Sequence, residues 1–216
     1  AKEDLRIALV LNYSTEDGGW SQSFYEAMVR TKEKLGLTDD HVLIMDNVDE
    51  YSSDAESVLD MLASDGVDLI IATSPGYNDA IATVAQKYPD VKFAMYEGNG
   101  GGQPNVVPFD IADYEAMFLC GYALAEISET DTLGFVACQP QSSCVRMLNA
   151  FAIGARYAKP EATVKVLWAN SWYDPAKEKE ATNTLISEGI NSVGFYGGTT
   201  AVASACNERS GVYTNG

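Results

Sequence analysis

Short apolar segments alternate with amphipathic segments along most of the chain, and this alternation constrains the fold more than any other feature. Four strands are expected in the first half, at residues 6–11, 41–46, 67–73 and 91–96. Helices are expected between them, at residues 21–35, 54–65 and 78–87. The strand at 67–73 is apolar on both faces, as parallel strands covered on both sides are. The pattern predicts an α/β fold with parallel sheets.

The alternation starts again after Asp110. Helices are expected at residues 114–127, 145–157, 175–188 and 201–209, with strands at 133–137, 164–169 and 192–196. Residues 105–110 then read as an extended crossover between two Rossmann-like lobes, residues 1–107 and 108–216, with a hinge between them. In such folds ligands bind in clefts outside the carboxyl ends of the strands.

The chain is strongly acidic, with a formal net charge of -17 over 216 residues. Such a surface repels nucleic acid and anionic lipid, so neither is an expected partner, and solubility is the simplest reason for the charge. No apolar run approaches the roughly 20 residues of a membrane helix. Residues 1–4 carry no signal-peptide pattern, which favours a processed end or a cloned start.

Catalytic patterns are absent from the sequence. The only histidine, His41, lies at the amino end of its expected strand, away from the edge where α/β ligand sites form. There is no G-x-S-x-G motif and no P-loop. The glycine-rich run at residues 98–103 leads into Pro104 rather than opening a helix, which argues against dinucleotide binding. We therefore expect no enzyme activity, no metal and no cofactor.

The four cysteines, Cys120, Cys138, Cys144 and Cys206, show no C-x-x-C spacing, which makes zinc binding an unfavourable interpretation. Cys138 and Cys144 are six residues apart, and a disulfide across this loop is open to them in an oxidising compartment. Two buried free thiols fit the same spacing. We predict the disulfide, and a buried thiol for Cys120.

Two tryptophans follow strand ends and precede helices, one in each expected lobe. Trp20 follows residues 6–11, and Trp172 follows residues 164–169. Two indoles would form a slot for a flat ring, and the alternative is that each packs against its own helix. Two further strand-end loops carry polar residues that suit either ligand contacts or turn geometry: Ser74, Tyr77 and Thr199. Residues 177–180 read as the solvated start of a helix capped by Asp174.

The motif Asp17-Gly18-Gly19-Trp20 and the run WYDPAKE at residues 172–178 resemble those of the basic membrane protein (BMP) family of ABC-transporter solute-binding proteins. The similarity is collinear from about residue 6 to 216 and includes residues 72–77, 88–93, 114–121 and 149–156. It implies a type I periplasmic-binding-protein fold that binds a purine base, a nucleoside or a related flat heterocycle. It also implies that Trp20 and Trp172 stack on that ring. By the same resemblance Asp17 and Ser21 are ligand contacts, and Ser21 stands where many relatives carry Asn.

The resemblance further implies an ABC permease as partner, a monomer, and a periplasmic or other extracytoplasmic location, including a lipoprotein anchor on the precursor. Ser143 and Thr199 stand where many relatives carry acidic residues, which weakens the expectation of a standard adenine contact. Family members continue further, so we expect the remaining C-terminal part of the fold to be missing here. The alternatives are a ligand-sensing domain that signals to a partner and a nucleoside-processing enzyme.

Overall fold

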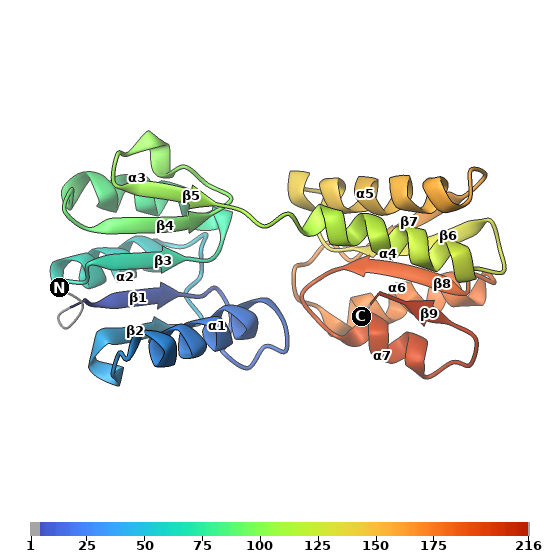
Figure 1. Cartoon of the computed structure of the whole chain (residues 1–216), viewed down its shortest axis with the longest axis horizontal. Helices are drawn as coiled ribbons and strands as arrows, with labels where there is room; N and C mark the ends of the chain where they lie inside the picture. Colours follow the sequence, from blue (N-terminus) through green and yellow to red (C-terminus); the bar gives the residue numbers. More distant parts are fainter. Residues whose placement is uncertain (1–4, 216) are drawn as a thin grey trace. The chain divides into compact units, whose positions relative to one another are not determined.

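The computed structural model describes residues 5–215, which form two compact α/β units that divide between Ile111 and Ala112 (Figure 1). Each unit contains one parallel sheet. The expected fold class is therefore confirmed: two α/β lobes, each with a parallel sheet covered by helices.

The first lobe has five strands in the order β2-β1-β3-β4-β5. They are β1 (Ile7–Val10), β2 (Val42–Met45), β3 (Leu69–Ala72), β4 (Lys92–Tyr96) and β5 (Val106–Phe109). Its helices are α1 (Trp20–Leu35), α2 (Ser53–Ser64) and α3 (Asn78–Lys87), with short 3-10 turns at Asp39–His41, Pro75–Tyr77 and Gly100–Gly102. Helices α2 and α3 cover one face of the sheet through buried side chains such as Leu59 and Ile81. Helix α1 covers the other face through Met28.

The segment between the lobes differs from the sequence expectation. Within the expected extended crossover, Val106–Phe109 forms the edge strand β5, which pairs in parallel with β4 and was not expected. The Asn105 side chain anchors its start, because its amide nitrogen donates to the carbonyls of Ala85, Tyr88 and Val91 at 3.1, 3.0 and 2.8 Å. The division consequently falls four residues later than residues 107 and 108.

The second lobe has four strands in the order β7-β6-β8-β9. They are β6 (Thr132–Ala137), β7 (Thr163–Trp168), β8 (Ser192–Tyr196) and β9 (Tyr213–Thr214). Its helices are α4 (Asp113–Ile127), α5 (Ser142–Ala158), α6 (Pro175–Ser187) and α7 (Ala201–Asn207). Helices α4 and α5 pack on one face, and α6 and α7 pack on the other. The two-residue strand β9 was not expected, because two residues are too few to show an alternation.

Two glycines allow α4 and α5 to lie side by side at very short range (Figure 1). A β-carbon on Gly154 would lie 1.9 Å from the carbonyl oxygen of Phe118. A β-carbon on Gly121 would lie 2.0 Å from the carbonyl oxygen of Phe151. Only glycine fits at this crossing, because any β-carbon would overlap the backbone of the facing helix.

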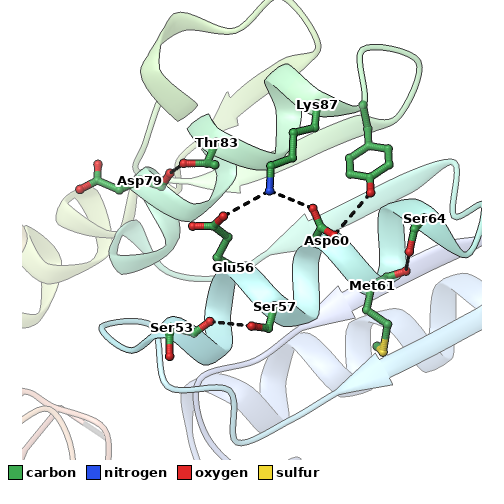
Figure 2. Close-up of polar contacts among 10 residues, drawn as sticks. Ser53, Glu56, Ser57, Asp60, Met61, Ser64, Asp79, Thr83 and Lys87 are labelled. Carbon is green, nitrogen blue, oxygen red and sulfur yellow. Dashed lines mark hydrogen bonds and ion pairs between the residues drawn. The ribbon is translucent and has the colours of Figure 1, made fainter.

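Lys87 links α2 and α3 on the surface of the first lobe. Its ammonium nitrogen lies 3.3 Å from Glu56 Oε1 and 3.1 Å from Asp60 Oδ1 (Figure 2). All three side chains are solvent-exposed, so these ion pairs contribute little to stability. The two helices are held chiefly by the apolar side chains beneath them.

Candidate functional site

Asp17 organises the loop that leads from β1 into α1. Its carboxylate accepts hydrogen bonds from the backbone N–H groups of Gly19 (2.9 Å), Ser21 (2.9 Å) and Gln22 (3.0 Å). These N–H groups belong to the start of a helix, where no carbonyl of the preceding turn can accept them. Asp17 therefore fixes the point at which α1 begins, and this places Trp20 as its first residue.

Trp20 is held by one hydrogen bond and by two aromatic neighbours. Its indole Nε1–H donates to the carbonyl oxygen of Thr73, just after β3, at 2.8 Å. Its ring packs edge to face with Phe24 (centroids 4.9 Å apart) and Tyr96 (4.8 Å). Phe109 lies 5.8 Å from Tyr96, and we call these four rings the first-lobe aromatic cluster. Trp20 remains partly exposed, so it is packed on one side and accessible on another.

An open depression lies beside this cluster at the carboxyl ends of β4 and β5. Its lining includes Phe109 together with the polar side chains of Asn78, Glu97, Asn99 and Asp110. Phe109 belongs to both the depression and the first-lobe aromatic cluster. The first lobe thus combines aromatic surface with amide and carboxylate groups at one edge of its sheet, which is the composition of many small-molecule sites.

A half-buried carboxylate lies behind the turn that joins β3 to α3. Burial raises the pKa of Glu50 above its ordinary value, and a hydrogen bond with the Ser74 hydroxyl opposes this rise. The Ser74 hydroxyl also accepts the N–H of Gly76 at 3.3 Å. A β-carbon on Gly76 would lie 2.6 Å from Glu50 Cγ, so the turn fits closely over the carboxylate. Ser74 therefore supports the turn through contacts within the lobe.

Two of the expected contact residues lie in the protein core. Ser21 and Tyr77 have no exposed surface. The Ser21 hydroxyl donates to Asn12 Oδ1 at 3.3 Å, and the Tyr77 hydroxyl donates to the carbonyl of Val48 at 2.8 Å. Both residues stabilise loops at the sheet edge instead of facing solvent, and we leave them out of the site proposed below.

Trp172 occupies the loop between β7 and α6 in the second lobe. Its carbonyl oxygen accepts the N–H of Gly198, in the turn between β8 and α7, at 3.0 Å. The following helix starts with an Asp174 cap, whose carboxylate accepts the N–H of Lys177 at 3.1 Å, and with Pro175 in the first turn. Trp172 is partly exposed. Within residues 5–215, no ring contact like those of Trp20 is found for it.

A fully buried carboxylate, which the sequence did not indicate, lies under the turn between β8 and α7. Glu178 is only 1% exposed, although residues 177–180 were expected to be solvated. The Thr199 hydroxyl donates to Glu178 Oε2 and accepts the N–H of Ala201 at 3.0 Å. Burial raises the pKa of Glu178, the Thr199 hydrogen bond lowers it, and the charge of Asp174 raises it further. Its neighbours along the helix are exposed, so composition alone gave no signal of this burial.

Cys138 and Cys144 are joined by a disulfide across the loop between β6 and α5. Ser143, beside it, is 8% exposed. Cys206 is a buried free thiol, and Cys120 is a half-buried one. In the described part of the chain, no three His, Cys, Asp or Glu side chains are placed to hold a metal ion. No helix within residues 5–215 is long and apolar enough to cross a membrane.

Two α/β lobes, each built on one parallel sheet, define the class of type I periplasmic-binding-protein folds. A solved ABC-transporter solute-binding protein from Conexibacter woesei is similar with a TM-score of 0.77 and 23% identity, covering 97% of this chain and 69% of that one. A solute-binding protein from Aeropyrum pernix has a TM-score of 0.81 and 18% identity, covering 97% and 61%. At these identities the likeness concerns the fold alone.

The model of the Bmp family, described as ABC transporter substrate-binding protein PnrA-like, matches residues 5–213. The chain belongs to this family, which consists of substrate-binding proteins and not enzymes. A putative ABC-transporter glucose-binding protein of Haloferax volcanii is 38% identical over 99% of this chain. A purine-binding protein of Brucella abortus is 32% identical over 97%. The chain spans 53% and 59% of the lengths of these two relatives.

Proposed function

We propose that this chain captures a purine base, a nucleoside or a similar flat heterocycle for an ABC importer. The observation that carries the proposal is the placement of Trp20. Its indole is fixed by the 2.8 Å bond to Thr73 and by two rings, yet part of it stays exposed at the carboxyl edge of the sheet. A preorganised, partly exposed indole suits stacking on a flat ring, since little side-chain entropy is lost on binding.

Trp172 is the second proposed stacking residue, from the corresponding loop of the second lobe. It is also partly exposed at a carboxyl strand end, and its backbone is held by Gly198. The groups around the open depression, such as the amide of Asn99, supply polar contacts in this proposal. Asp17, Ser74 and Thr199 act by holding the loops in place, because their polar atoms already bond within their own lobes.

The proposed partner is an ABC permease, and the proposed location is periplasmic or otherwise extracytoplasmic, with the protein acting as a monomer. Family membership supports the permease and the location. The purine-binding relative of Brucella abortus supports the ligand class. The disulfide between Cys138 and Cys144 agrees with an oxidising compartment.

A sugar is the second candidate ligand, and one observation favours it. The relative from Haloferax volcanii is named as a putative glucose-binding protein and is 38% identical to this chain. An exposed indole also buries the apolar face of a pyranose ring, so the aromatic residues alone do not separate the two ligand classes.

Isothermal titration calorimetry with adenine, adenosine, riboflavin and glucose, each added to the purified protein, tests the proposal. We expect micromolar or tighter binding of at least one of the three heterocycles and no measurable heat with glucose. Binding of glucose alone would replace the heterocycle by a sugar. Absence of binding for all four would overturn the proposed ligand class. Chromatography of the adenosine sample after incubation checks the enzyme alternative, which requires released adenine.

A further inference from the structure

Glu178 has an unusual environment for a carboxylate. It lies in the first turn of α6 with 1% of its surface exposed, and its Oε1 atom is buried without a hydrogen-bond partner. The ammonium groups of the neighbouring Lys177 and Lys179 point elsewhere, pairing with Asp174 at 3.0 Å and Glu208 at 2.8 Å. Burying a carboxylate with one hydroxyl partner and no cation is costly. We therefore looked for a structural role that offsets the cost of burying Glu178.

The contacts of Glu178 lead directly to the turn between β8 and α7. Its Oε2 atom accepts the Thr199 hydroxyl, and its Oε1 atom lies 3.0 Å from where a β-carbon on Gly197 would be. Gly198, between these two residues, donates its N–H to the carbonyl of Trp172 at 3.0 Å. The carboxylate, the turn and Trp172 therefore form one continuous chain of contacts.

The neighbouring cavity is too small to hold the ligand. The space lined by Glu178, Cys138, Tyr196 and Gly197 amounts to about 150 Å³ between atoms, with no room for a water molecule. Ligand pockets commonly measure about 300–1,000 Å³. Glu178 consequently does not contact a ligand here, and its influence passes through the turn.

We propose that Glu178 is a positioning residue that fixes the turn at residues 197–199 and, through Gly198, the backbone of Trp172. This inference rests on the proposed function, in which Trp172 stacks on the ligand. It predicts that the Glu178–Thr199 hydrogen bond sets the position of Trp172 even when no ligand is present.

The test uses Trp172 as the only tryptophan, in a protein that carries Trp20→Phe and Trp168→Phe. Acrylamide quenching of Trp172 fluorescence, without ligand, reports how well the indole is held. Thr199→Val removes the hydroxyl but keeps the shape, and we expect displaced turn conformations to become about five-fold more populated. The quenching constant should rise accordingly. Glu178→Ala should act in the same direction.

Three variants serve as controls. Thr199→Ser keeps the hydroxyl, and Glu178→Gln keeps an acceptor for it, so both should give the quenching of the parent. Thr182→Val removes a hydroxyl that is also buried but donates to the backbone carbonyl of Glu178 at 2.7 Å. It should leave the quenching unchanged, although it costs similar stability.

Parent-like quenching in Thr199→Val, or an equal increase in Thr182→Val, would overturn the proposal. If Glu178→Ala fails to fold, the difference in acrylamide quenching between Thr199→Val and Thr182→Val still tests the proposal. The two threonine substitutions are then made in the protein that retains Trp20 and Trp168 and titrated with adenosine, and Thr199→Val should bind about five-fold more weakly than Thr182→Val. Altered quenching, together with no adenosine binding by the protein that retains Trp20 and Trp168, would keep the positioning role and reject the adenosine ligand.

Discussion

Replacing Trp20 separates its packing role from its proposed binding role. Trp20→Ala removes the hydrogen bond to Thr73, worth about 0.5–1.5 kcal/mol. It also removes edge-to-face contacts with Phe24 and Tyr96, each worth about 0.5–1.5 kcal/mol beyond burial. Because the indole is partly exposed, the total should stay below that of a fully buried tryptophan. We expect the free energy of unfolding to fall by about 2–4 kcal/mol.

Two further variants serve as comparisons for the stability loss of Trp20→Ala. Trp20→Phe keeps an aromatic ring and loses the N–H, so it should cost about 1 kcal/mol. Trp172→Ala removes a side chain with no such ring contacts and should cost less than about 1 kcal/mol. Urea denaturation, monitored by circular dichroism, measures the free energy of unfolding of all three variants. If the dependence of that free energy on urea concentration is unchanged, the denaturation midpoints can be compared directly.

Ligand affinity is then measured by calorimetry under conditions where each variant is folded. Either alanine variant should weaken heterocycle binding by about 2–4 kcal/mol, with the Trp172 variant showing this loss at nearly full stability. A Trp20→Ala protein of unchanged stability would refute the packing argument. A folded double alanine variant that binds with unchanged affinity would refute the stacking role of both indoles.

Three other outcomes are expected. Thiol titration under denaturing, non-reducing conditions should find two reactive thiols, and four would contradict the bridge between Cys138 and Cys144. Because burial raises the folded-state pKa of Glu178, its contribution to stability is fully present below roughly pH 4.3 and is lost as pH rises through the raised pKa. Glu178→Gln should therefore gain stability relative to the parent over that window, and parallel pH curves would contradict this. Gly154→Ala should destabilise by about 1–3 kcal/mol in thermal unfolding. The exposed Asn149→Ala on the same helix should stay within about 0.5 kcal/mol, and equal effects would disprove the close crossing.

The sequence anticipated the first-lobe loops only in part. The place of Trp20 after a strand followed from the order of apolar segments, and the structure agrees. Asp17 and Ser21 beside it were expected to contact the ligand, an expectation that came from the family resemblance alone. Only the three-dimensional structure shows that Ser21 is buried and that the Asp17 carboxylate accepts three N–H groups at the start of α1.

In the second lobe, local sequence signals predicted a helix but not which of its side chains is buried. The helix that begins at Pro175 was expected from its cap and its proline, which are local signals. The burial of Glu178 depends on the turn at residues 197–199, about twenty positions later in the chain, and its own neighbours are charged and exposed. A pattern read along one helix does not contain the turn that covers it.

The sequence by itself determined the alternation of strands and helices, the two-lobed α/β class and the placement of both tryptophans at carboxyl strand ends. These features follow from hydrophobic periodicity and helix signals, which act over a few residues. Tertiary structure alone decided that Val106–Phe109 pairs as a fifth strand, that Tyr77 lies in the core and that Glu178 lies beneath a turn. Strand pairing and burial are set by partners distant in sequence, because they depend on which surfaces lose contact with water when the whole chain folds.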